Sequence, residues 1–410
     1  MLDTVAIITT ITALFAFLNY KIVKLPTTIG VMAITLSISL VFIALKYFGF
    51  DGIANSAMEL SSKIDFNQVV MDGMLSFLLF AGALHVNLNE LSEKKWAILL
   101  MSTLGVLITT FLFGYASFYI FSYVGVHVPL IYCLAFGALI SATDPIAVLG
   151  ILKTSGAPKS LTVKCIGESL FNDGVAYVVF IVLSGIAVGT TELDPLAISI
   201  LFVEEAFGGV AFGLLIGGVA YGMLKSIDNY QVEVLITLAL VLGGYAFAQH
   251  IHISGPIAIV VAGLMIGNHG RMFAMSSQTR DHLDTFWELI DEILNAVLFV
   301  MIGIEILAIN YSPLVFISGL ILIPTLLIAR LISTSLLLGV LKFKYTFTPH
   351  AELLLTWGGL RGAISVALAL SIPEGPEREV ILLATYSIVV FSILVQGLTI
   401  GRLVNYLIKK

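Results

Sequence analysis

Oxygen-bearing side chains that could bind a small cation are concentrated in two short segments of the sequence, GALISATDPIAVLG and GESLFNDG. The first contains Thr143 and Asp144, and the second contains Ser169 and Asp173. Carboxylate, hydroxyl and carbonyl oxygens are hard ligands, which suit Na+ or Li+ better than a soft metal. Zinc and iron are not expected, because none of the seven histidines lies in a ligand-spaced cluster with cysteine or glutamate. The two segments therefore predict a site for a small monovalent cation.

Helical spacing sorts the polar groups of GESLFNDG. Residues four apart lie on the same face of a helix. This spacing places Glu168 over Asn172, and Ser169 over Asp173. Ser169 and Asp173 are therefore expected to share one site.

The composition indicates which solvent surrounds these segments. Of 410 residues, 59% are hydrophobic and 11% are charged, and the mean hydropathy is +1.06, whereas soluble proteins carry about a quarter charged residues. A soluble enzyme is excluded, and so is a secreted disulfide scaffold, because the two cysteines, Cys133 and Cys165, lie in or beside apolar runs. The net charge of -6 argues against a nucleic-acid partner. Most of the chain must lie in lipid.

A membrane-spanning helix needs about 20 mostly apolar residues. Thirteen segments of the sequence meet this requirement. The fold predicted is therefore an all-α polytopic membrane protein, a single integral membrane domain over residues 1–410. The approximate spans are residues 4–20, 26–48, 66–88, 96–123, 130–152, 163–189, 198–224, 231–250, 255–269, 283–309, 313–341, 349–372 and 380–406.

The first polar segment belongs to the fifth of these spans. Pro145 has no N–H group, so the carbonyl of Ser141 loses its helical donor and the helix should be interrupted there. Broken helices at mid-membrane are tolerated where they line a cavity, and their freed carbonyls can coordinate ions. The alternative is a simple proline kink with a hydrogen-bonded Asp144.

Positive charges predict the orientation of the chain. Fifteen of the lysines and arginines fall on one side of the thirteen spans, three on the other, and two lie within spans. Because short positively charged loops stay in the cytoplasm, the N-terminus is expected outside and the C-terminus inside the plasma membrane. Neither a cleavable signal peptide nor a soluble regulatory domain is expected.

Arg330 lies in the middle of a span, in LIPTLLIARLIS. An unpaired guanidinium there would be very unfavourable, so a buried acid must pair with it. Glu168 is one candidate and Asp144 is the alternative. We expect this pair to hold helices together rather than to carry ions.

Together the two polar segments, SATDPIAVLG and GESLFNDG, resemble the signature of the monovalent cation:proton antiporter-1 family, the NhaP-type sodium/proton exchangers. Further similarity lies in GLMIGNHGR, in TRDHLDTFWELIDEILNAVLFVMIG and in WGGLRGAISVALAL. The resemblance covers roughly residues 70–400.

The resemblance implies a function for the polar side chains. Cation and proton would compete for Asp173, with Asn172 supporting the site and with Thr143, Asp144 and Ser169 completing the coordination of Na+. Proteins of this family exchange Na+ or Li+ for H+ by alternating access and so serve pH homeostasis. No cofactor is implied, and the surroundings are membrane lipid.

The resemblance also implies an architecture. Inverted repeats would place two broken helices across each other in a core domain of spans 4–6 and 11–13. The remaining spans would form a dimerisation domain, and the protein would be a homodimer. Glu168 would pair with Arg330 on the eleventh span. The second broken helix would lie in the twelfth span, at Gly358, Gly359, Arg361 and Gly362.

One position departs from the family. In several relatives the third span has a glutamate in a stretch resembling LLFEGAL, whereas this chain has Ala81 in LLFAGALHVNL. The cation site is therefore not expected to use an acid from that span, which bears on affinity and on the preference between Na+ and K+. Asp72, His85 and Glu305 are expected to be interfacial or lining residues rather than ligands.

Three alternatives stay open. The family resemblance, with Asn172 in place of a second aspartate, implies one proton per cation and electroneutral exchange; a K+/H+ antiporter is the alternative within the same class. A cation channel would also gather buried acids, although a single site on broken helices favours a carrier. An intramembrane aspartyl protease would need two aspartates on adjacent helices, but Asp144 and Asp173 do not lie in motifs of that class.

Overall fold

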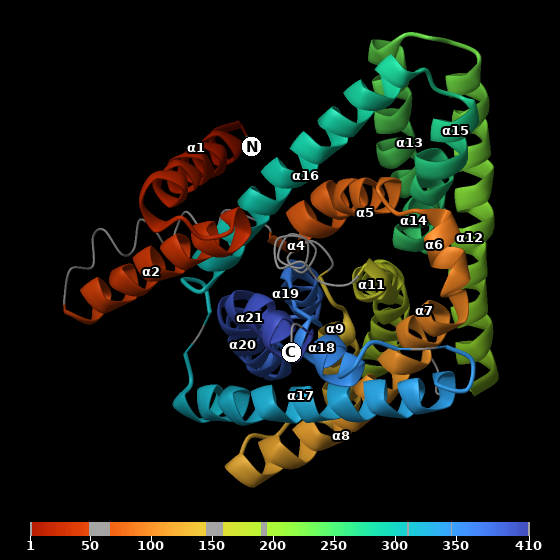
Figure 1. The fold of residues 1–410 in the computed structure, drawn as a ribbon. Coiled ribbons are helices and arrows are strands. Elements are labelled where there is room, and N and C mark those ends of the chain that lie inside the picture. Colours follow the sequence, from red (N-terminus) through yellow and green to blue (C-terminus); the bar gives the residue numbers. More distant parts are fainter. Residues whose placement is uncertain are drawn as a thin grey trace.

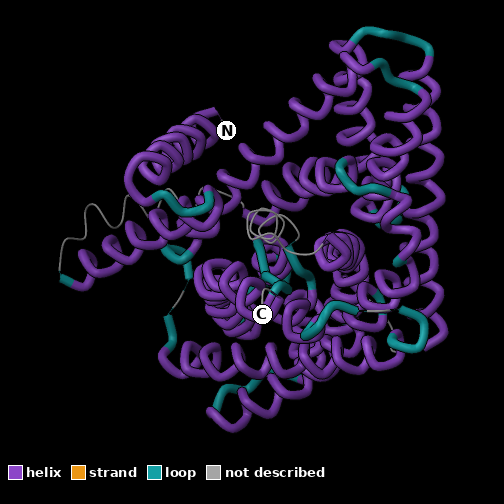
Figure 2. The backbone as a smooth tube through the Cα atoms, viewed as in Figure 1, coloured by secondary structure: helices purple, strands orange, loops and turns teal. Residues whose placement is uncertain are grey.

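The computed structural model describes residues 2–48, 66–144, 159–189, 195–309, 311–345 and 347–408. Within these residues every regular element is a helix, and no strand occurs (Figure 2). The prediction of an all-helical chain is confirmed.

The helices follow one another with mostly short connections. In chain order they are α1 Leu2–Leu18, α2 Thr27–Tyr47, α4 Phe66–Gln68, α5 Leu75–Leu84, α6 Leu88–Glu93, α7 Lys95–Ser102, α8 Leu104–Val124, α9 Leu130–Ser141, α11 Lys159–Val188, α12 Pro195–Lys225, α13 Tyr230–His250, α14 Gly255–Met265, α15 Arg271–Phe273, α16 Ser277–Glu305, α17 Pro313–Leu341, α18 Ala351–Trp357, α19 Ala363–Leu370, α20 Pro376–Phe391 and α21 Gly397–Ile408. Among the described residues, four short π-helical turns adjoin these helices, at Asn19–Val23, Val69–Met74, Ile266–Gly270 and Ser392–Gln396.

Helices occupy all thirteen segments that the sequence singled out. Ten helices among the described residues are long and apolar enough to cross a membrane. The other three segments contain α9, the more polar α16, and the pair α18 and α19. That these three also cross the membrane stays a prediction.

The exterior of the bundle is apolar, and its interior contains charges. Phe207, Leu215 and Ile328 are each more than half exposed. By contrast, Glu168 and Arg330 are 2% and 3% exposed. Lipid favours an apolar exterior, and charged groups inside it must face the interior of the bundle.

Figure 1 shows how the helices surround a central group. Helices α12, α13 and α14 pack together along one side, and α16 extends from them to α2 on the opposite side. In the middle, α9 contacts α8, α11, α19 and α20. The two polar segments of the sequence, which end α9 and run through α11, therefore meet at the centre of the molecule.

The twelfth predicted span consists of two short helices. Helix α18 ends at Trp357, α19 begins at Ala363, and residues 358–362 between them are not helical. The sequence of this interruption is GGLRG. Its backbone passes the end of α9, where the amide of Asp144 donates to the carbonyl of Leu360 at 2.8 Å.

Glycine allows α8 and α9 to approach each other closely. A Cβ atom added at Gly137 would lie 2.3 Å from the carbonyl oxygen of Thr110 on α8. A separation of this size is far inside van der Waals contact, so an alanine would force the two helices apart. Small residues commonly permit such close crossings in membrane proteins.

We therefore expect Gly137→Ala to destabilise the protein by about 1 to 3 kcal/mol, the usual cost of overpacking. The measurement is the apparent melting temperature of the purified protein in detergent. Gly339→Ala on α17 is the matched control, because a Cβ atom there would meet no described atom within 4 Å. Equal melting temperatures for the two variants would contradict the close approach of α8 and α9.

Candidate functional site

Helix α9 ends at the first polar segment. Its last helical residue is Ser141, and Ala142 has φ -58° and ψ 137°, so the chain continues in an extended form. Residues 142–144 are described and not helical, and Pro145 lies outside the described residues. The carbonyl groups at the end of α9 therefore need partners from outside the helix.

Arg361 supplies those partners. Its Nη1 donates to the carbonyl oxygens of Ser141 at 2.6 Å and of Ala142 at 2.7 Å. Ser365 donates to the carbonyl of Leu139 at 2.9 Å. The sequence predicted that the Ser141 carbonyl lacks a helical donor and could coordinate an ion. In this structure it accepts a hydrogen bond from a guanidinium group instead. A positive charge at the C-terminal end of a helix also complements the helix dipole.

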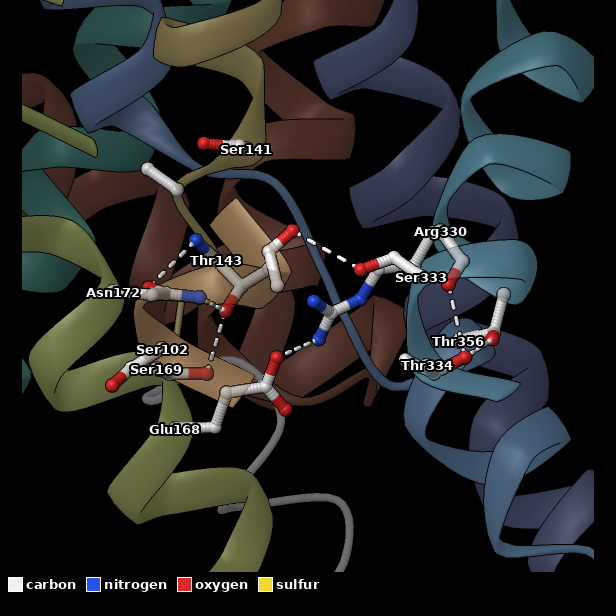
Figure 3. Close-up of polar contacts among 12 residues, drawn as sticks. Ser102, Ser141, Thr143, Glu168, Ser169, Asn172, Arg330, Ser333, Thr334 and Thr356 are labelled. Carbon is white, nitrogen blue, oxygen red and sulfur yellow. Dashed lines mark hydrogen bonds and ion pairs between the residues drawn. The ribbon is translucent and has the colours of Figure 1, made fainter. Parts of the chain in front are cut away.

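Thr143 is tied to α11 by three hydrogen bonds (Figure 3). Its amide donates to Asn172 Oδ1 at 3.2 Å, and Asn172 Nδ2 donates to its hydroxyl oxygen at 2.6 Å. The hydroxyl groups of Thr143 and Ser169 are 2.7 Å apart. Ser169 and Asn172, which the sequence placed on two faces, thus meet the same residue. They are three residues apart, a spacing that also makes neighbours on a helix.

Asp173 is the charged group that these contacts leave free. It is 3% exposed, and neither carboxylate oxygen has a hydrogen-bond partner among the described residues. It lines a cavity of about 40 Å³, room for a few water molecules, together with Thr143, Asp144, Gly362 and Asn295. A buried polar group without a partner is costly and calls for an explanation in function or in a missing ligand.

Asp144 lies at the edge of this cavity, half-buried and next to the interrupted span. A Cβ atom at Gly362 would lie 2.6 Å from Asp144 Oδ2. Only a residue without a side chain leaves room for the carboxylate at that point. The glycine therefore fixes how closely Asp144 approaches residues 358–362.

Glu168 and Arg330 form an ion pair beside the site. Arg330 Nη2 donates to Glu168 Oε1, and the two side chains are 4% and 2% exposed, respectively. Arg330 therefore contacts Glu168 rather than lying unpaired in its span. Figure 3 shows Arg330 reaching from α17 to Glu168 on α11, beside the contacts of Thr143. Its geometry fits a role in holding α11 against α17.

The residues predicted to be peripheral lie away from these contacts. Asp72 and His85 are exposed, and Asp72 accepts from Gln249 Nε2 at 3.2 Å. Glu305 is 8% exposed, at the end of α16. Ala81 is buried on α5, and its neighbour Gly82 lines the cavity.

Sequence reasoning missed Asn295. It lies on α16, is 2% exposed, and lines the same cavity as Asp173. A polar residue at the start of the apolar half of α16, four residues after Asp291, was the available signal.

The oxygen atoms at the cavity define the ions that it could hold. Within the described part of the chain, no group of three or more His, Cys, Asp or Glu side chains gathers to bind a metal ion. The side-chain oxygens that line the cavity belong to the carboxylates of Asp144 and Asp173, the hydroxyls of Thr143 and Ser365, and the amide of Asn295. Few hard ligands around a small space suit a monovalent cation or a proton.

Known proteins resemble this chain over nearly its whole length. A family model described as sodium/hydrogen exchanger, transmembrane, matches residues 7–406. The Na+/H+ antiporter NhaP of Pseudomonas aeruginosa is 51% identical over 409 residues, which cover 99% of this chain and 96% of the relative. The Na+/H+ antiporter NhaH of Halobacillus dabanensis is 34% identical over 395 residues, 94% of this chain and 93% of the relative.

A solved structure has the same fold. The sodium proton antiporter MjNhaP1 from Methanocaldococcus jannaschii, solved at pH 8, gives a TM-score of 0.78. The match covers 100% of this chain and 99% of that chain at 20% sequence identity. The likeness therefore extends over the whole helical architecture.

Proposed function

The chain belongs to the sodium/hydrogen exchanger family, the monovalent cation:proton antiporter-1 family, and from this premise we propose that it exchanges Na+ for H+ across the plasma membrane. The cation and the proton compete for Asp173, and exchange proceeds by alternating access. The names of the relatives NhaP and NhaH, both Na+/H+ antiporters, support this function.

The state of the Asp173 carboxylate carries the proposal. Both oxygens are buried without a hydrogen-bond partner among the described residues, next to a cavity that could hold a small ion. A bare charge in such a place is strongly unfavourable, so the carboxylate must bind either a proton or a cation. The proton and the cation exclude each other on Asp173, and one of the two must always be bound. Transport of one is therefore coupled to transport of the other in the opposite direction.

The charges around the cavity favour an electroneutral cycle. Glu168 and Arg330 offset each other as an ion pair, and Asp173 is the carboxylate that binds the cation or the proton. One monovalent cation or one proton on Asp173 gives the carrier the same net charge in both loaded states. Asn172, an amide bonded to Thr143, adds no further charge. We therefore propose one proton per cation.

The position of the cavity supports alternating access. Residues 142–144, which follow α9, line the cavity together with α11 and α19, and α5 and α16 supply its other lining residues. In the proposed division, the first three belong to the core domain and the last two to the dimerisation domain of a homodimer. Movement of one wall along the other would expose the cavity first to one side of the membrane and then to the other. The proposed orientation has the N-terminus outside.

The test is cation-driven proton movement in proteoliposomes that contain the purified protein and a trapped pH dye. We expect Na+ and Li+ to move protons out of an acid interior, with no membrane potential developing at symmetric pH. K+ should have little effect. The potential is followed with a voltage-sensitive dye in the same vesicles.

Each other result has a defined meaning. A response to K+ alone would change the substrate to that of a K+/H+ antiporter. A Na+ current at symmetric pH would contradict the electroneutral cycle. Ion flow without proton movement, at a rate far above that of a carrier, would indicate a channel and would overturn the proposed function.

A further inference from the structure

We propose that the side-chain oxygen of Asn295 is a ligand of the transported cation, contributed by the wall of the cavity opposite Asp173. The inference rests on the proposed function and adds to it a residue that governs which cation binds. It follows from the burial of Asn295, from its hydrogen bonds, and from the helix that carries it.

Asn295 lies where a ligand would be needed. It is 2% exposed and lines the cavity that also has Asp144, Asp173 and Thr143 on its wall. The neighbouring residues of the opposite wall are apolar, namely Leu75, Leu78, Leu79 and Leu298. Asn295 is thus the polar group that α5 and α16 present to the cavity.

The hydrogen bonds of Asn295 orient its amide. Its Nδ2 donates to the backbone carbonyl of Asp291 at 2.7 Å and to Asp291 Oδ1 at 3.1 Å. A carbonyl oxygen only accepts, so the NH2 group must be the end that faces Asp291. The amide oxygen is then the polar atom left to face the cavity. Asp291 is a positioning residue, because it acts through Asn295.

An amide oxygen is a suitable ligand for Na+. It is a hard, neutral donor, so it can bind a cation without adding a charge to the site. It also differs from the ligands on α9 and α11 in its location, because it belongs to the wall that stays behind when those helices move. The cation would keep this ligand in one orientation of the carrier and lose it in the other.

The ligand should matter more for Na+ than for Li+. Selectivity between hard cations depends on cavity size and on the number of ligands. The smaller Li+ is satisfied by fewer oxygens than the larger Na+. Loss of the Asn295 oxygen should therefore weaken the binding of Na+ more than that of Li+.

The experiment measures equilibrium binding of 22Na+ to the purified full-length protein, with Li+ as a competitor. Asn295→Leu keeps the size of the side chain and removes the oxygen. We expect its Kd for Na+ to rise about tenfold, as for the loss of one interaction with a charged group, and its Kd for Li+ to rise about threefold or less.

Asn268→Leu is the matched control. Asn268 is also a partly buried asparagine, but its amide binds the backbone at Val86, Leu264 and Leu88. It should alter the melting temperature without changing the ratio of the two Kd values. A change below twofold for Asn295→Leu, the same factor for both cations, or an equal effect of Asn268→Leu would overturn the inference.

The proposed function is checked separately in the same preparation. If the unaltered protein exchanges Na+ for H+ and Asn295→Leu binds Na+ as tightly, the inference alone fails. If the unaltered protein binds Na+ but moves no protons, the proposed exchange fails while the binding data still decide the role of Asn295. If it neither binds Na+ nor moves protons, both are overturned.

Discussion

Asp173→Asn should abolish cation-driven proton movement, lowering the rate at least about 100-fold, or about 2.7 kcal/mol. Asparagine has the size of aspartate, but it neither takes up a proton at neutral pH nor offers a negative charge to a cation. Both oxygens of Asp173 lack hydrogen-bond partners among the described residues, so the substitution removes the charge that is left for a cation or a proton to neutralise. The measurement is the proton flux in proteoliposomes described above.

The same substitution should not cost stability. It replaces a buried charge that has no hydrogen bond with a neutral amide, so the melting temperature should stay the same or rise. Asp281→Asn, at an exposed position of α16, is the matched control and should leave both the flux and the melting temperature unchanged. Normal flux in Asp173→Asn would show that exchange does not depend on this carboxylate.

Breaking the ion pair between Glu168 and Arg330 should have the largest effect on stability. Arg330→Leu leaves the Glu168 carboxylate buried without its partner, which costs about 3 to 5 kcal/mol. The two side chains are 2% and 4% exposed, so water cannot replace the lost contact. The measurement is the apparent melting temperature in detergent, together with the yield of folded protein.

A double-mutant cycle measures the interaction free energy of Glu168 and Arg330 separately from the effects of the two single substitutions. Glu168→Gln combined with Arg330→Leu removes both charges, and it should recover much of the stability that Arg330→Leu loses. The surface pair of Arg378 and Glu374, 3.5 Å apart with Glu374 94% exposed, is the matched control. Glu374→Gln should cost less than about 1 kcal/mol. Additive losses in the cycle would refute a stabilising role for the buried pair.

The positions of the helices could be predicted because lipid imposes simple rules. Each apolar segment of about 20 residues must satisfy its own backbone, and helices occupy all thirteen such segments. The end of α9 near Pro145 and the interruption at residues 358–362 were also visible as proline and glycine signals. What the sequence did not contain was how these two interruptions contact each other.

The site was predictable only along single helices. Spacing on α11 placed Glu168 over Asn172 and Ser169 over Asp173, and a mid-span arginine required a buried acid. The spacing of four residues alone separated Ser169 from Asn172, although both contact Thr143. Asn295 could not be assigned, because it reaches the cavity from a helix more than 100 residues further along the chain.

The hydrogen bonds between the two interruptions set a mechanical limit on the carrier. Arg361 binds the carbonyls of Ser141 and Ala142, Ser365 binds that of Leu139, and the amide of Asp144 binds Leu360. Sliding α9 past α19 would break these bonds in the interior of the membrane, where no water could replace them. In the proposed alternating-access cycle, the two interrupted segments would therefore travel as one rigid body. The slip plane of that cycle would lie along the leucine-lined wall of α5 and α16.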